Sequence, residues 1–291
     1  MSSNVRIVDL YRGRDTVMSF EVFPPKKQEE ASIASLYAVI EELTALSPQF
    51  ISVTYGAGGS ENAQRKTGEI AEYIASYDVP ALAHLTCVGR DRQGVLSLVD
   101  ELIARGVGNV LALRGDMPPD REVPMGYRYA NELIKDIRLH APELCIGAAC
   151  YPEGHIDCSV ERICLDRMKA KQDAGADFFV SQLCFDNELF YRFVDKARAV
   201  GIHAPISAGI MPILSRKQIE RMIFMCGVSL PAQIVKLLHR YEDNPQDLRA
   251  AGIDFAAQQA QAMTKRGADG VHIYTMNHPD IATACAQAMY L

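Results

Sequence analysis

The stretch ARGVGNVLALRGD (residues 104–116) contains one complete junction of an α/β protein. Gly106 closes a helical pattern, as is typical of a helix C-cap, where glycine adopts a left-handed backbone at little cost. The run 109–114 is largely apolar without alternation, which indicates a parallel strand buried on both faces. Asp116 follows at the carboxyl end of that strand. The stretch therefore predicts a helix end, a buried strand and a polar strand tip, in that order.

The same junction recurs along the whole chain. Strands are predicted at residues 17–23, 50–54, 81–86, 109–114, 145–150, 177–182, 204–208 and 270–275. Helical patterns lie near residues 28–46, 61–77, 92–105, 126–140, 158–174, 187–200, 215–226 and 245–267. Units of this kind, spaced roughly 30 to 40 residues apart, suit a closed barrel better than an open sheet.

The sequence thus predicts an α/β fold, a (β/α)₈ TIM barrel that forms a single domain over residues 1–291. No linker-like change of composition divides the chain. Residues 1–14 precede the first predicted strand, and we expect them to form an N-terminal extension that covers one end of the barrel.

Composition narrows the functional classes. The chain has 291 residues, of which 48% are hydrophobic and 23% charged, and its formal net charge is −6. That charge, without a concentrated Lys/Arg run, argues against a nucleic-acid partner. No apolar stretch approaches the roughly 18 residues of a membrane span, and residues 1–14 lack the apolar core of a secretory signal. We therefore expect a cytoplasmic protein with no membrane partner.

The eight cysteines lie far apart and form no C-x-x-C pair. Such spacing is poor for zinc, for an iron–sulfur cluster and for a small disulfide framework. Most of them lie in apolar runs, where cysteine behaves as a small hydrophobic residue. We expect no metal site in this chain and a reducing compartment.

Polar side chains recur where the predicted strands end. In a (β/α)₈ barrel these ends meet at one face, and active sites are built there. An unpaired ionisable group in such a place would be costly to bury, so its repetition on most strands indicates a site. These residues are Glu21, Thr54, Tyr55, His84, Arg114, Gly115, Asp116, Tyr151, His155, Gln182 and Tyr274.

Taken together, these segments resemble the methylenetetrahydrofolate reductase family, in its bacterial single-domain type. The matching segments are SFEVFPP (19–25), SVTYGA (52–57), AHLTC (83–87), ALRGDMPP (112–119), YPEGH (151–155), KQDAGAD (171–177), SQLCFD (181–186) and HIYTMN (272–277). They cover nearly the whole chain, and the first and fourth are the most specific. The resemblance implies a flavoprotein oxidoreductase of one-carbon metabolism and methionine biosynthesis. Its reaction would be the reduction of 5,10-methylenetetrahydrofolate to 5-methyltetrahydrofolate by hydride transfer from reduced flavin.

The resemblance implies two catalytic carboxylates. Glu21 would be the general acid that promotes opening of the folate ring, a role that typically contributes about 10² to 10⁴ in rate. Asp116 would lie close to the flavin and the pterin, where its charge tunes the redox potential and its oxygens accept from the pterin edge. Without the resemblance, Glu21 also suits a carboxylate paired with an arginine, and Asp116 suits a turn cap.

The resemblance also implies binding residues. For the flavin and its electron donor these are Thr54, Tyr55, Ala57, His84, Arg114, Gly115, Asp116, Ala130, Tyr151, His155, Arg167 and Lys171. For the folate they are Glu21, Asp116, Gln182, Gln218, Tyr274 and His278. Lys171 and Arg114 suit phosphate or ribityl oxygens, and Gly115 lets the backbone approach a planar ring. On its own, His84 would more often be a core histidine, Thr54 a strand residue and Gln218 plain surface.

The chain departs from the family pattern in the segment before Lys171. Cys164 and Arg167 stand where the family usually carries the Asp and Asn that serve the adenosine half of FAD. FAD is therefore expected with FMN as the alternative, and His278 stands where an arginine commonly meets the folate. The electron source is NAD(P)H or a partner subunit with an iron–sulfur centre, as in some family members. A homo-oligomer is also expected.

Two other readings stay open. The first is a pterin-binding methyltransferase barrel, which would place Asp and Gln against a pterin without a flavin. The second is a non-catalytic scaffold subunit of an electron-transfer complex, against which the presence of both Glu21 and Asp116 argues.

Overall fold

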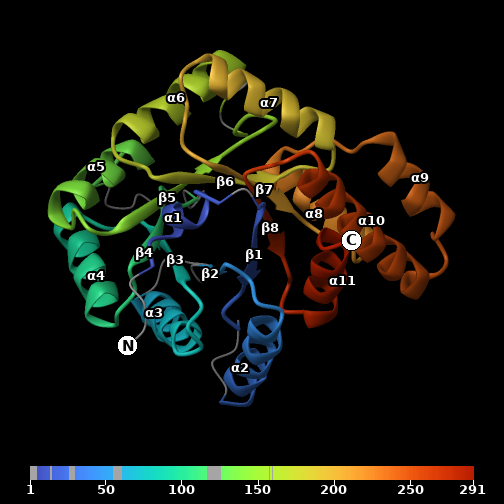
Figure 1. Cartoon of the computed structure of the whole chain (residues 1–291), viewed down its shortest axis with the longest axis horizontal. Helices are drawn as coiled ribbons and strands as arrows, with labels where there is room; N and C mark the ends of the chain where they lie inside the picture. The colour runs from blue at the N-terminus through green and yellow to red at the C-terminus, as the bar shows by residue number, and fades with distance from the viewer. Residues whose placement is uncertain are drawn as a thin grey trace.

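The computed structural model of the chain describes residues 5–13, 15–25, 30–54, 61–116, 126–156, 158 and 160–291, with only the backbone at residues 30 and 61–65. Within these ranges the strands are β1 (Val17–Val22), β2 (Phe50–Val53), β3 (Ala81–Thr86), β4 (Asn109–Leu113), β5 (Cys145–Cys150), β6 (Phe178–Leu183), β7 (Ile206–Ile210) and β8 (Gly270–Tyr274). They form a closed barrel in chain order, with every neighbouring pair parallel and β8 paired to β1 (Figure 1). The predicted (β/α)₈ barrel is confirmed.

Helices surround the barrel (Figure 1). They are α1 (Ile7–Leu10), α2 (Glu30–Ala45), α3 (Glu61–Ala75), α4 (Arg92–Ala104), α5 (Ala130–His140), α6 (Glu161–Asp173), α7 (Asn187–Ala199), α8 (Arg216–Cys226), α9 (Ala232–Arg240), α10 (Pro245–Lys265) and α11 (Pro279–Met289). Three of these were not predicted from the sequence, namely α1, α9 and α11. The predicted count of eight helices was wrong, because three helices separate β7 from β8 and the helix of the last unit is α11.

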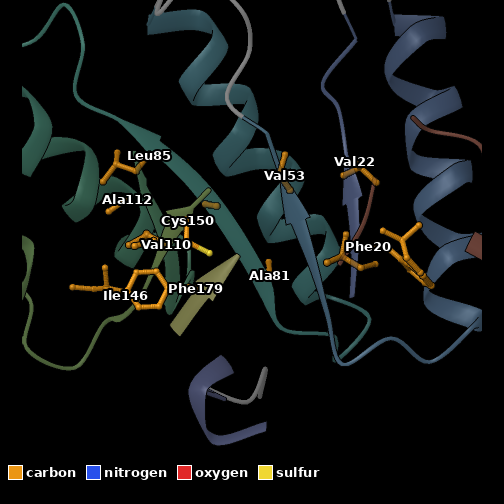
Figure 2. Packing of buried hydrophobic residues seen from close by; sticks show 14 of the residues in the cluster. Phe20, Val22, Val53, Ala81, Leu85, Val110, Ala112, Ile146, Cys150 and Phe179 are labelled. Atoms are coloured by element: carbon orange, nitrogen blue, oxygen red, sulfur yellow. The ribbon is translucent and has the colours of Figure 1, made fainter. Parts of the chain in front are cut away.

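The strands divide the core into an outer and an inner layer, because successive side chains point to opposite faces. On β1, Met18, Phe20 and Val22 point outward into the main apolar core between strands and helices. Figure 2 shows members of this layer from neighbouring strands. Ser19 and Glu21 take the alternate positions, which face the inside of the barrel. Polar groups inside the barrel are therefore held by the same strands whose other faces anchor the core.

The amino end of the barrel is closed by α1. Ile7 is fully buried there in an apolar cluster formed with residues near the amino ends of the strands, among them Phe50 and Phe178. The backbone N–H of Ile7 donates to Asn109 Oδ1 at 2.8 Å, and Tyr11 Oη lies 2.8 Å from Ser207 Oγ. In Figure 1, α1 lies across the strands inside the ring of helices. Side chains therefore fill the amino end of the barrel interior, and the polar groups there, Asn109 and Ser207, are hydrogen-bonded to the α1 segment.

Among the described residues, no helix combines the length and the apolarity that a membrane crossing requires.

Candidate active site

Glu21 lies inside the barrel near the carboxyl end of β1, and it is only 5% exposed. The strand register places it beside Ser52 on β2 and Tyr274 on β8. Ser52 Oγ donates to Glu21 Oε2 at 3.3 Å. A buried carboxylate of this kind is costly unless it has partners, and the neighbouring strands supply them.

His272 connects Glu21 to a deeper hydroxyl group. Its Nε2 lies 3.4 Å from Glu21 Oε2 and 3.2 Å from Ser52 Oγ. Its Nδ1 lies 2.7 Å from Ser19 Oγ, which also reaches the backbone oxygen of Val271 at 3.3 Å. His272 and Ser19 are fully buried. A line of hydrogen-bonding groups therefore runs from Ser19 through the imidazole to Glu21.

His84 approaches the same carboxylate from β3. Its Nε2 lies 3.4 Å from Glu21 Oε2, and its side chain is 10% exposed. Burial lowers the pKa of His84 below its ordinary value, and the neighbouring His272 lowers it further, while the charge of Glu21 opposes both. His84 is therefore neutral near pH 7. We call Glu21, Ser19, Ser52, His84 and His272 the Glu21 cluster.

Sequence reasoning found two members of this cluster, Glu21 and His84, and missed the other three. A signal was available for two of the three. Ser19 lies two residues before Glu21, and His272 lies two residues before Tyr274. Because a strand has a period of two, these pairs share the inner face of the barrel.

Tyr274 reaches from β8 across β7 to β6. Its hydroxyl group donates to the backbone oxygen of Ser181 at 3.0 Å. A Cβ atom on Gly209 of β7 would lie 2.4 Å from that same oxygen and 3.0 Å from the Tyr274 hydroxyl. Only glycine leaves room for this crossing. Burial foremost, and then the charge of Glu21, raises the pKa of Tyr274 well above its ordinary value, so Tyr274 stays protonated.

Gln182 lies where the ladder between β6 and β7 is irregular. The pairing moves from Val180–Ser207 to Leu183–Gly209, so β6 uses one residue more than β7. The amide oxygen of Gln182 accepts from the backbone N–H of Leu183 at 2.9 Å. Bulges of this kind often redirect side chains beside active sites. Here the bulge coincides with a side chain whose amide oxygen is already used by its own backbone neighbour.

A cavity of about 840 Å³, including its opening to solvent, lies between the ends of β4 and β5 and the helices α5 and α6. We call it the α5–α6 pocket. It is lined by Ala112, Leu113, Arg114, Tyr129, Ala130, Asn131, Ala149, Cys150, Tyr151, His155, Cys164, Arg167, Met168, Lys171 and Phe193. Six of the residues predicted for the cofactor are therefore brought together: Arg114, Ala130, Tyr151, His155, Arg167 and Lys171.

Lys171 is the most buried cation of this pocket. Its Nζ donates to the backbone oxygen of Ala149 at 2.7 Å and lies 5.5 Å from the centre of the Tyr151 ring. Burial lowers the pKa of Lys171 to about 8. Burial likewise raises the pKa of Tyr151 to about 12. An anion entering the pocket would favour the charged form of this lysine.

Two further cations lie over one aromatic ring at the edge of the pocket. The guanidinium groups of Arg128 and Arg167 lie 5.3 Å and 5.5 Å from the centre of the Tyr129 ring. Tyr129 is also the N-cap of α5, which points the positive end of that helix towards the pocket. The pocket thus combines aromatic surface with positive charge, a combination that suits a planar ring bearing phosphate.

Asp116 lies beyond β4 on the exposed surface. The preceding Gly115 has φ +87°, and a Cβ there would lie 2.6 Å from Val88 Cγ1. The charge of Asp116 is felt by Tyr151, whose raised pKa is caused by burial and, to a lesser extent, by Cys150 and Asp116. Tyr151 and Glu21 both contribute to the raised pKa of Tyr274. Both predicted catalytic carboxylates therefore lie at the same end of the barrel.

The remaining predicted residues lie outside these two groups. The amide of Gln218 bonds the backbone N–H of Leu214 at 2.7 Å and the backbone oxygen of Pro212 at 3.2 Å, so it holds the loop before α8. His278 is exposed at the start of α11. Thr54 continues β2, and its backbone oxygen accepts from Thr67 Oγ1 at 3.2 Å. The predictions for Tyr55 and Ala57 fall outside the described residues.

Within the described part of the chain, no three His, Cys, Asp or Glu side chains gather in a way that could hold a metal ion.

A model of the methylenetetrahydrofolate reductase family matches residues 6–289. The chain belongs to this family. It is 34% identical over 281 residues to "Methylenetetrahydrofolate reductase (NADH) 1" of Arabidopsis thaliana, an alignment that covers 90% of this chain and 46% of the plant protein. It is 30% identical over 273 residues to "5,10-methylenetetrahydrofolate reductase" of Escherichia coli, covering 94% of this chain and 90% of that protein. The chain therefore spans about half the length of its plant relative and most of its bacterial relative.

Solved structures of low sequence identity share the fold. A Clostridium thermocellum protein described as binding two copies of 5-methyl-5,6,7,8-tetrahydrofolic acid has a TM-score of 0.72 and 16% identity, and the match covers 98% of this chain and all of that one. Dihydropteroate synthase from Xanthomonas albilineans, solved with 7,8-dihydropteroate, has a TM-score of 0.55 and 14% identity, with 95% and 91% coverage. At these identities the likeness establishes the barrel fold alone.

Proposed function

We propose that this protein reduces 5,10-methylenetetrahydrofolate to 5-methyltetrahydrofolate with a bound flavin, and that Glu21 is its general acid. The observation that carries the proposal is the placement of two different groups at one end of the barrel. A buried carboxylate with hydrogen-bonded partners lies inside the strands, and a cationic, aromatic pocket lies beside β4 and β5. Membership in the family supports this assignment of chemistry to the two groups.

The residues of the α5–α6 pocket fit a flavin. Lys171, Arg167 and Arg114 supply positive charge for phosphate, and the amino end of α5 adds to it. Tyr129 and Tyr151 supply aromatic surface. Gly115, which has no room for a Cβ, brings backbone close to the strand tips. When bound there, a flavin supplies the hydride that reduces the folate.

The substrate step needs one proton and one hydride. As the five-membered folate ring opens, the bond between the methylene carbon and one ring nitrogen breaks, and that nitrogen takes a proton from Glu21. The methylene carbon then accepts the hydride and becomes the methyl group. Glu21 suits the acid role because it is buried, faces the interior and has hydrogen-bond partners for its ionised form in Ser52 and His272.

His272 holds Glu21 in position. Its Nε2 lies 3.4 Å from Glu21 Oε2 and its Nδ1 lies 2.7 Å from Ser19 Oγ, so the imidazole is fixed between the carboxylate and the hydroxyl group. His272 does not touch the substrate in this scheme and acts as a positioning residue, whose contact with the carboxylate affects the balance between its protonated and ionised forms. Glu21 would take up its next proton from solvent at the carboxyl end of the barrel after the product has left.

The pterin end of the folate would lie between the two groups. Gln182 would donate its amide nitrogen, because its oxygen already accepts from Leu183. Asp116 would accept from the amino edge of the pterin. Gln218 and His278 follow β7 and β8, on the side of the carboxyl ends of the strands, and they are the candidates for contact with the rest of the folate.

NADH is the first electron donor to test, because the name of the plant relative includes it. A partner subunit with an iron–sulfur centre is the second. The two donors are separated by a single assay with the purified chain, since only NADH can reduce the flavin without another protein.

The test uses the purified full chain under anaerobic conditions. We expect it to bind flavin with the visible absorption of the oxidised ring, to be bleached by NADH and to recover its colour when 5,10-methylenetetrahydrofolate is added. Formation of 5-methyltetrahydrofolate is followed by chromatography. A chain that binds methylated folate, refuses both FAD and FMN and shows no reduction would overturn the proposal and favour the methyltransferase barrel.

The identity of the flavin is tested separately. Mass spectrometry of the cofactor released on denaturation distinguishes FAD from FMN. The two differ by the AMP half, which would extend towards Cys164 and Arg167. FAD is our expectation, and retention of FMN alone would show that this end of the pocket does not recognise adenosine.

A further inference from the structure

Two cysteine sulfurs touch at the wall of the α5–α6 pocket. Cys158 and Cys164 have their Sγ atoms 2.6 Å apart. Both cysteines are free, and the Cys164 thiol donates to Cys158 Sγ, so the two sulfurs lie close enough to be joined without a large movement of the backbone. All eight cysteines lie in the described part of the chain, and only this pair has sulfurs in contact.

The two cysteines belong to different local structures. Cys158 precedes α6, and its backbone N–H donates to the backbone oxygen of His155 at 2.7 Å. Cys164 lies in the second turn of α6, and its thiol also approaches the backbone oxygen of Cys158 at 3.5 Å. Gly154 fits beneath them with φ +87°, since a Cβ there would lie 3.2 Å from Cys158 O and 3.8 Å from Cys164 Sγ. A bond between the sulfurs would join the loop that carries His155 to the helix that carries Lys171.

The accessibility of the two thiols differs. Cys158 is buried, at 9% exposure, whereas Cys164 is partly exposed and lines the pocket. A soluble oxidant would therefore reach Cys164 first, by way of the pocket. Cys158 is then the resolving thiol, because it already touches the sulfur that has reacted.

We propose that Cys158 and Cys164 are a thiol–disulfide modification site that is open when the α5–α6 pocket is empty and closed when a flavin fills it. The oxidant is a low-molecular-weight disulfide. The Cys164 thiolate attacks one sulfur of the oxidant, forms a mixed disulfide and releases one thiol. The Cys158 thiolate then attacks Cys164 Sγ, forms the intramolecular bond and releases the second thiol. Two protein thiols are oxidised and one small disulfide is reduced to two thiols.

The local environment sets the rate of this reaction. Burial foremost, together with the hydrogen bond to Cys158, raises the pKa of the Cys164 thiol. The thiolate is the nucleophile, so the reaction is slow near neutral pH and accelerates as the pH rises.

The experiment treats the purified full chain with oxidised glutathione, with and without flavin, and maps the peptides by mass spectrometry. We expect a Cys158–Cys164 linked peptide that dithiothreitol reverses. C158S should instead retain one glutathione on Cys164, because the resolving thiol is gone, and C164S should form neither product. Cys226→Ser, which removes a partly exposed thiol elsewhere, should leave the linked peptide unchanged.

The flavin arm tests the coupling to the pocket. At a flavin concentration of about ten times Kd, the rate of linkage should fall about tenfold, because only about a tenth of the pockets remains empty. No linkage, or linkage of another cysteine pair, would overturn the proposal. An unchanged rate with flavin demonstrably bound would overturn the coupling. This inference rests on the proposed function only for the identity of the protecting ligand. A chain that forms the disulfide but binds no flavin would contradict the proposed function and would still support the modification site.

Discussion

The Glu21 cluster and the α5–α6 pocket lie at the same end of the barrel, but they are built differently. The groups of the cluster stand on neighbouring strands and bond one another in the buried interior. The cations of the pocket stand on α6, on the segment before α5 and just beyond β4, and several of them are partly exposed. The strands hold the Glu21 carboxylate in place, whereas the pocket is lined largely by side chains of helices and loops.

This difference implies that chemistry and cofactor binding are separable in this protein. A change in the cluster should reduce turnover while leaving flavin affinity unchanged. A change in the pocket should lower flavin affinity while leaving turnover at saturating flavin unchanged. Each of the following variants compares its effect on turnover with its effect on flavin affinity.

The largest effect is expected for Glu21→Gln. The amide keeps the shape of the side chain but cannot give up a proton as a carboxylic acid does, so folate reduction should fall by about 10² to 10⁴. Flavin binding and reduction of the flavin by NADH should stay near the wild-type level. Stopped-flow measurement of the two half-reactions checks this, with the exposed Glu101→Gln as the control. Equal losses in both half-reactions would contradict the division between the two regions.

Lys171→Met should weaken flavin binding about 10- to 100-fold, because a hydrogen bond to a charged group contributes roughly 1.5–3 kcal/mol. The wild-type affinity should also depend on pH. Since burial lowers the pKa of Lys171 to about 8, the lysine of the empty pocket is charged below that pH and loses its proton above it. Flavin affinity should therefore be constant below pH 8 and decline above it.

In Lys171→Met that decline should disappear. Fluorescence titration of flavin across the pH range measures both effects, and Lys265→Met on the exposed surface of α10 is the control. A wild-type affinity that increases above pH 8 would exclude Lys171 as the phosphate partner.

His272→Asn should slow folate reduction by on the order of tenfold, the equivalent of one lost hydrogen bond of about 1.4 kcal/mol. The loss should be smaller than for Glu21→Gln, because the carboxylic acid itself is still present. The pH profile of the folate half-reaction should change shape, which a purely structural role would not require. His239→Asn serves as the control, since the His239 side chain is 87% exposed. An unaltered pH profile would show that His272 has no influence on the protonation of Glu21.

Arg167→Gln should have the smallest effect. Arg167 is exposed, and an exposed ion pair with a phosphate contributes at most about 1 kcal/mol, so flavin affinity should fall only about two- to fivefold. Turnover at saturating flavin should not change. Arg162→Gln, on the same helix and exposed, provides the comparison. A larger loss for turnover than for affinity would place Arg167 in the chemistry and weaken the contrast between the regions.

Much of the fold was predictable from the sequence because its signals are local. Apolar runs and glycine caps placed all eight strands within two residues at each end. α11 was missed because its buried face is made mainly of small residues, Ala282, Cys285 and Ala286 beside Ile281, which give little hydrophobic contrast. Pro279 at its first turn was a usable signal.

The site was predictable only where position along a strand decides it. Glu21 and His84 follow from strand patterns, whereas the bond from Gln182 to its own neighbour depends on a bulge that no local pattern specifies. The contact between Cys158 and Cys164 depends on how the segment before α6 turns back onto the helix. The two cysteines form no C-x-x-C pair, so their spacing in the sequence did not indicate this contact.

α1 fills the amino end of the barrel with packed side chains, so in the part of the chain that the structure describes Glu21 is approached from the carboxyl ends of the strands. Under the proposed function, the folate and the flavin would therefore meet on that side. A short helix far from any reacting atom would thus determine the direction from which the ligands bind.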